Sequence, residues 1–302
     1  MNRNIEILAK ACKKRRLNIS KAAVEKLVRY CLLVYYAYRD AYLVDCCLLE
    51  PCDAVTLIKD MSSLLELEPE RFIVVQLHMD CLIANKSKVQ GKLERLRAQD
   101  WLCHPLVIDV NGETPLIVTT KHLVDTIASK LEERIESWKV APDDTLLTLN
   151  PTESLLEVVG LPFIAGWLLN YPCLYLSLRP DGINCLSCAS LEKYSITLNL
   201  VQDQDIAAAS VKLAAKVPVS LVPSSVSPGV IDIMEFTVPS SILQHEEFRD
   251  RLNKTLECIT SYITRTTELY CQKKIESKQL LHLGVGDVEI TQTTVKQNCV
   301  VL

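Results

Sequence analysis

Glycine is scarce in this chain, and the motifs that depend on it are missing. The 302 residues include 8 glycines, and none has the spacing of the loops that cradle a nucleotide phosphate. Gly284 and Gly286 lack the third glycine of a dinucleotide-binding motif and follow no predicted strand. A G-x-S-x-G nucleophile turn and an H-E-x-x-H zinc motif are missing too. We therefore expect no cofactor, and the sequence leaves open whether the protein is an enzyme.

An excess of positive charge is also lacking. The formal net charge is −4, and 49% apolar against 23% charged residues is the balance of a globular protein. The basic run from Lys10 to Arg16 is a candidate for phosphate contact or an import signal. However, no aromatic side chains interleave it, as a base-stacking surface requires, and a solvated helix face explains it more simply. We expect no nucleic-acid partner.

The N-terminus has no apolar core of the kind that a secretion signal needs. Residues 161–178 carry no formal charge and just reach the length of a membrane-spanning helix. Pro162 suits the first turn of a helix and Pro172 stops it, which leaves a helix of about 10 residues, about half of a bilayer core. We predict a buried helix followed by a strand from Cys173, no transmembrane segment, and a cytoplasmic location.

The 13 cysteines are a high count, which a reducing compartment explains. Several lie inside apolar runs, where a reduced thiol behaves as a small hydrophobe: Cys31, Cys46, Cys47 and Cys173. Cys185 and Cys188 form a single C-x-x-C pair without a second pair at zinc-site spacing. We expect no metal and interpret this pair as core or turn cysteines, with a metal or redox role as the alternative.

Hydrophobic periodicity alternates between helix and strand through the first half of the chain. Helices are expected over residues 4–16, 86–99 and 162–171, and after the cap candidates Ser20, Asp53, Thr119 or Thr120, and Ser241 with Gln244. Strands are expected over residues 42–46, 72–77, 106–110, 116–118, 173–178, 194–200 and 230–236.

These elements predict an α/β protein with a single mixed β-sheet flanked by helices. The single domain is expected over residues 1–276, with an αβ-alternating half to about residue 150. The half over residues 151–276 is expected to be more antiparallel, because no strong helix separates its strands. We predict a flexible tail over residues 277–302, where the periodicity fades.

Carboxylates stand at the ends of several predicted strands. Asp45, Asp80 and Asp109 occupy such positions, and His78 and His104 lie near them in sequence. In an α/β sheet, ligands bind beyond the carboxyl ends of strands, so these side chains are candidates for holding a cation or acting as a base. The alternative is that the acids cap turns and helices, which is common at strand exits.

The last four residues, from Cys299 to Leu302, match a C-a-a-X prenylation signal, and a terminal leucine favours geranylgeranyl. Lys296 alone supplies nearby basic charge, and one lipid holds a membrane weakly. This predicts at most a weak membrane association through Cys299. A strand added to a PDZ-like groove and a chance apolar end are the alternatives.

Three segments resemble an uncharacterised vertebrate protein family, named after human chromosome one open reading frame seventy-four. They are GLPFIAGWLLNYPCLYL from Gly160, INCLSCASLEKYSI from Ile183 and YLVDCC from Tyr42. The resemblance extends over most of the chain. It implies no activity, cofactor or catalytic residue, and the C-a-a-X end is not part of what it implies.

The missing motifs favour a non-catalytic binding or scaffold protein with protein partners. One alternative is a cation-dependent enzyme or ligand binder that uses the strand-end carboxylates. Another is a prenylated peripheral membrane protein. The sequence does not choose among them.

Overall fold

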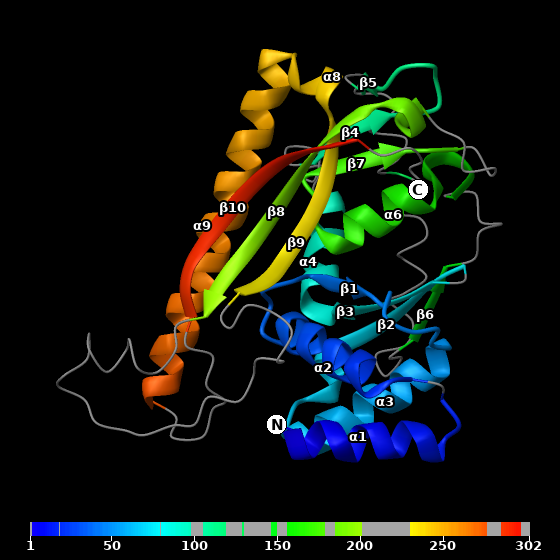
Figure 1. Ribbon diagram of the computed structural model, residues 1–302, viewed down its shortest axis with the longest axis vertical. Coiled ribbons are helices and arrows are strands. Elements are labelled where there is room, and N and C mark those ends of the chain that lie inside the picture. The colour runs from blue at the N-terminus through cyan, green and yellow to red at the C-terminus, as the bar shows by residue number, and fades with distance from the viewer. Residues whose placement is uncertain are drawn as a thin grey trace.

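The computed structural model describes an α/β protein whose strands form three sheets (Figure 1). The described residues are 2–17, 19–78, 80–97, 105–118, 129, 146–149, 156–178, 185–200, 230–276 and 285–296. The α/β class is confirmed, and the antiparallel character of the C-terminal half is found in its long sheet.

The first sheet has the strand order β1-β3-β2-β6. Its strands are β1 (Ala41–Leu43), β3 (Asp80–Asn85), β2 (Phe72–Leu77) and β6 (Leu146–Leu149). β6 is parallel to β2, and the other pairs are antiparallel. β2 is the β-branched run FIVVQL, and all its residues except Gln76 are buried. Strands covered on both faces are typically apolar throughout, which explains this run.

Three N-terminal helices pack at one end of the molecule, against this sheet (Figure 1). They are α1 (Asn2–Lys14), α2 (Lys21–Tyr35) and α3 (Pro51–Leu65). The predicted cap at Ser20 is confirmed, because its hydroxyl accepts a hydrogen bond from the Ala23 amide at 3.1 Å. α3 begins at Pro51, two residues before the predicted cap Asp53, since proline is favoured at the first helical position.

The central apolar stretch forms a helix and a strand, as predicted. α6 (Leu156–Leu169) has a kink at Gly160, where φ is 75°, and Pro162 lies in the first turn after it. The helix ends before Pro172, and β7 (Cys173–Leu176) follows. β7 is parallel to β4 (Leu106–Asp109), which pairs with β5 (Leu116–Ile117) to complete the second sheet. In the described part of the chain, no helix is long and apolar enough to cross a membrane.

The third sheet is long, antiparallel and ordered β10-β8-β9. Its strands are β8 (Ser190–Leu200), β9 (Val230–Pro239) and β10 (Val285–Lys296). After β9, the short helix α8 (Ser240–Leu243) leads into α9 (Glu246–Glu276), which runs along this sheet (Figure 1). Phe248, Leu252, Leu256 and Ile263 of α9 are buried in the core of the third sheet, and their spacing places them on one face of the helix.

Four expectations about secondary structure are corrected. The single sheet is three sheets, because an apolar pattern records that a strand is buried but not which strand it pairs with. The predicted tail contains β10 over residues 285–296. This strand pairs with β8 along its length, a partner that the sequence pattern does not identify. Ser241 and Gln244 belong to α8 and its end, and α9 starts at Glu246 without that capping box. The predicted cap of α3 at Asp53 is also corrected, because the helix begins at Pro51.

Among the described residues of the first half, α4 (Lys86–Arg97) agrees with the expected weak helix. The helix predicted after Thr119 or Thr120 lies outside the described residues.

The Gly160 kink gives a test of the fold. A β-carbon at Gly160 would overlap the carbonyl oxygen of Ser177, and a positive φ disfavours L side chains. We expect Gly160→Ala to lower the free energy of unfolding in urea by about 1–3 kcal/mol from backbone strain alone. The matched control is Gly91→Ala within α4, where the added methyl meets no atom within 4 Å. That change should stabilise by about 0.5–1 kcal/mol. Equal effects of the two would contradict the kink.

Candidate functional site

The three strand-end carboxylates do not all gather at one place. Asp45 and Asp80 lie at the same edge of the first sheet, next to the hydrogen bond from the Val44 amide to the Cys81 carbonyl at 2.9 Å, whereas Asp109 lies in the second sheet. Asp45 follows β1 in the first sheet, where it accepts a hydrogen bond from the Tyr42 hydroxyl at 2.9 Å. Asp109 ends β4 in the second sheet and accepts hydrogen bonds from the backbone and side-chain nitrogens of Asn111 at 2.9 and 2.8 Å. These bonds make Asp109 a turn residue, as the alternative interpretation proposed. Asp80 is exposed at the start of β3.

The histidine and cysteine candidates are likewise separate. His78 is exposed in the turn between β2 and β3, while His104 and Cys299 lie outside the described residues, so their roles stay predictions. Cys185 begins the short 3-10 helix Cys185–Cys188 and packs partly buried against the core of the third sheet. Within the described ranges, no three His, Cys, Asp or Glu side chains could hold one metal ion.

A cavity of about 310 Å³ lies where the loop before β1, α4, the end of α6, β7, β9 and α9 meet. Its apolar walls include Trp167 and Tyr171 beside α6 and Met234 of β9. Among the described residues, its charged lining consists of four cations and one carboxylate: Arg39, Lys88, Lys92, Arg95 and Asp40. The cavity is at the small end of the range for small-molecule pockets, and its few polar groups among aromatic walls are typical of them.

Lys92 and Asp40 form a buried ion pair at the inner end of this polar set. The Lys92 ammonium lies 2.8 Å from the Asp40 carboxylate, and both side chains are less than a tenth exposed. The Lys92 ammonium also donates hydrogen bonds to the carbonyl oxygens of Trp167 at 2.7 Å and Leu168 at 3.2 Å. These are end carbonyls of α6, where the helix dipole is negative. All three ammonium donors therefore have partners.

Burial is the main influence on the Lys92 ammonium. It lowers the pKa of Lys92, the charge of Asp40 opposes this, and the nearby cations Arg95 and Lys88 add to the lowering. An ammonium with three acceptors and a carboxylate at 2.8 Å is a structural cation. It also neutralises the one carboxylate of the described cavity lining.

Three cations remain around the cavity once this pair is set aside. Lys88 lies 4.0 Å from the centre of the Tyr262 ring, and Arg39 lies 4.8 Å from the Tyr30 ring. Arg95 is exposed at the opening. Aromatic faces stabilise a cation without cancelling its charge. The described lining of the cavity is therefore positive, in a chain whose net charge is −4.

The sequence contained a signal for this site that the motif search did not use. Lys88, Lys92 and Arg95 have the spacing i, i+4, i+7, which places them on one face of α4. Val89 on the same helix is buried, so a lysine three residues later falls within the inward stripe. A cation on an inward stripe needs a buried partner, and here that partner is Asp40.

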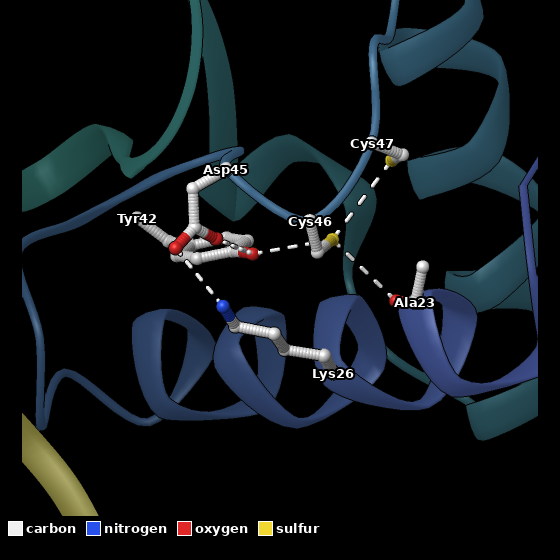
Figure 2. A network of polar contacts seen from close by, with 6 residues as sticks. All are labelled: Ala23, Lys26, Tyr42, Asp45, Cys46 and Cys47. Atoms are coloured by element: carbon white, nitrogen blue, oxygen red, sulfur yellow. Dashed lines mark hydrogen bonds and ion pairs between the residues drawn. The ribbon is translucent and has the colours of Figure 1, made fainter.

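A second polar cluster lies between α2 and the loop after β1 (Figure 2). Lys26 of α2 contacts the Asp45 carboxylate at 2.9 Å. Cys46 follows Asp45, and its sulfur lies 3.8 Å from that of Cys47 and 3.4 Å from the Tyr42 hydroxyl. Both thiols are half-buried and pack against the N-terminal core, whereas Cys31 and Cys173 are fully buried.

Fold and site together define the class of this protein: an α/β protein with a cation-lined cavity beside a long antiparallel sheet. The model of the family described as Domain of unknown function (DUF4504) matches residues 9–260. The chain belongs to that family. No curated protein and no solved structure matches the chain.

The buried ion pair gives a stability prediction. Lys92→Met leaves the Asp40 carboxylate and two α6 carbonyls without their cation, so we expect a loss of about 3–5 kcal/mol in the free energy of unfolding. Lys88→Met on the same helix is the control, and it should cost no more than about 1 kcal/mol because Lys88 is partly exposed. Adding Asp40→Asn to Lys92→Met should recover part of the loss. Urea denaturation measures all three, and equal costs for Lys92 and Lys88 would disprove the buried pair.

Proposed function

We propose that this protein is a non-catalytic binding protein whose cavity takes a small organic anion. The observation that carries the proposal is the lining of the cavity, in which four cations face aromatic and apolar walls and the one described carboxylate is already paired with Lys92. A ligand with an anionic group and an apolar body matches this combination.

The two ends of the cavity support different parts of such a ligand. Lys88 and Arg95 lie seven residues apart on the same face of α4, where they can pair with a carboxylate or phosphate. A guanidinium such as that of Arg95 pairs with these groups through two parallel hydrogen bonds. Trp167, Tyr171 and Ile259 supply the apolar surface for the rest of the ligand.

The state of Lys92 supports binding over catalysis. A lysine that acts as a nucleophile or base needs a free lone pair on its nitrogen. Lys92 instead donates to a carboxylate and two carbonyl oxygens at 2.7–3.2 Å, and Asp40 favours its charged form. The pair supports the cavity wall and needs no chemical role.

Two finer inferences accompany this proposal. A cytoplasmic location is supported by nine cysteines in the described ranges that carry no disulfide. Membership of the vertebrate family that the sequence resembles is supported by the three quoted segments, all of which lie within the matched residues 9–260.

Ligand-induced stabilisation tests the proposal. The probes are a nucleoside monophosphate, an arylcarboxylate and a medium-chain fatty acid, each compared with its uncharged nucleoside, amide or alcohol. A ligand at a hundred times its dissociation constant stabilises the folded state by about 2.7 kcal/mol, which thermal denaturation resolves. We expect at least one anion to stabilise the protein and its uncharged counterpart to have no effect.

Variants locate the binding. The double change Lys88→Met with Arg95→Met removes two charged hydrogen-bond donors, so it should weaken binding at least about tenfold. Lys254→Met on α9, an exposed lysine outside the cavity lining, is the control and should bind normally. Equal stabilisation by charged and uncharged ligands, or normal binding by the double variant, would exclude the proposed anion site.

A further inference from the structure

The cluster around Cys46 is separate from the cavity lining and is not used by the proposed binding function. We propose that Cys46 is a thiol that reacts with hydrogen peroxide, and that Cys47 converts the oxidised sulfur to a disulfide. The proposal rests on the contacts of the two sulfurs, shown in Figure 2.

Cys46 is surrounded by groups that can stabilise a thiolate. The Cys47 thiol lies 3.8 Å away and the Tyr42 hydroxyl 3.4 Å away, and either can donate a hydrogen bond to a negatively charged sulfur. When Cys46 carries its proton, it donates to the carbonyl oxygen of Ala23 at 3.6 Å. When Cys46 ionises, its weak hydrogen bond to the Ala23 carbonyl is lost, and its negatively charged sulfur can accept hydrogen bonds from Cys47 and Tyr42.

Tyr42 has one proton and two acceptors, which makes Lys26 part of the site. The hydroxyl lies 2.9 Å from Asp45 and 3.4 Å from Cys46. The Lys26 ammonium pairs with the other oxygen of Asp45 at 2.9 Å. Because Lys26 already balances the carboxylate, the Tyr42 proton can turn to Cys46 when that thiol ionises.

The charges around the sulfur agree with this assignment. The hydrogen bond from Cys47, followed by that from Tyr42, lowers the pKa of Cys46 to about 6, while burial and the charge of Asp45 oppose the shift and Lys26 assists it. The hydrogen bond with Cys46, followed by burial, raises the pKa of Cys47, so the second thiol keeps its proton while the first reacts. Cys31 of α2 is buried nearby, and burial raises its pKa, so it stays neutral.

The reaction proceeds in two balanced steps. The Cys46 thiolate attacks one oxygen of hydrogen peroxide: an S–O bond forms, the O–O bond breaks, and the departing hydroxide takes up the proton that Cys46 released. The sulfur is now a sulfenic acid. Cys47 then loses its proton and attacks that sulfur, so that the S–S bond forms, the S–O bond breaks and a second water leaves. Two thiols and one peroxide give one disulfide and two waters.

A disulfide between the adjacent residues Cys46 and Cys47 is expected to be readily reversible. The Cα atoms of neighbouring residues are about 3.8 Å apart across a trans peptide, which is closer than in most disulfides. Such a bond is strained and is easily reduced by cellular thiols. Because Cys46 is half-buried, a small oxidant can reach it more readily than a peptide disulfide can.

Peroxide titration of the full chain, followed by peptide mass mapping, tests the proposal. We expect the peptide that holds Cys46 and Cys47 to lose two hydrogen atoms at lower peroxide doses than those that oxidise the exposed Cys52 and Cys258. A reducing thiol should restore its mass. In Cys47→Ser, the reaction should stop at a sulfenic acid on Cys46, which a dione reagent traps. Oxidation of Cys46 no faster than that of the exposed pair would overturn the proposal.

The pH dependence of the rate at which Cys46 is alkylated tests its contacts with Tyr42 and Asp45. Removing these two groups should move the midpoint of that dependence in opposite directions. Tyr42→Phe keeps the ring, which stacks on Tyr30 at 4.6 Å, and removes one donor. It should raise the midpoint for Cys46 by roughly one pH unit. Asp45→Asn removes the opposing charge and should lower the midpoint. Tyr30→Phe, which removes the hydroxyl of the stacked ring, should leave it unchanged. Circular dichroism checks that each variant is folded, and a midpoint that does not move in Tyr42→Phe would refute the thiolate contact.

Discussion

The buried cation of Lys92 is the constraint on which the central part of this structure depends. A charge taken out of water must be paired and hydrogen-bonded, so Lys92 requires Asp40 and the end of α6 at fixed distances. Asp40 is itself placed by backbone: its carbonyl accepts the Asn85 amide at 2.8 Å. The Asn85 side chain bonds the Val34 carbonyl at 2.9 Å and also caps the start of α4. One polar chain thus links α2, the first sheet, α4 and α6.

The same ion pair forms part of the wall of the cavity. Lys92 and Asp40 line it together with Trp167 of α6 and Tyr262 of α9. The excess positive charge is local. A net charge of −4 argues against a long-range positive field that would attract nucleic acid. The net charge does not report the three cations that line the same cavity of about 310 Å³.

Arg39 connects the cavity with the thiol cluster. It lines the cavity, and its guanidinium lies 4.8 Å from the Tyr30 ring and 5.9 Å from the Tyr42 ring. Tyr42 is the residue whose hydroxyl reaches Cys46. Arg39 therefore borders both the cavity and the ring whose hydroxyl contacts Cys46. The short loop from Tyr38 to Asp40 and the strand β1 hold both sites within a few residues of each other.

The sequence by itself determined the α/β class, the cap at Ser20, the strand FIVVQL and the proline-limited helix before β7, because each depends on neighbours along the chain. It also identified Cys31 and Cys173 as core thiols from their apolar surroundings. The three sheets, β10, and the separation of Asp45 from Asp109 were decided only by tertiary structure. So were the Asp40–Lys92 pair and the Tyr42–Cys46 contact with Lys26 behind it. Periodicity reports which face of an element is buried, whereas pairing partners and electrostatic neighbours come from segments that are distant in the chain and meet only when it folds.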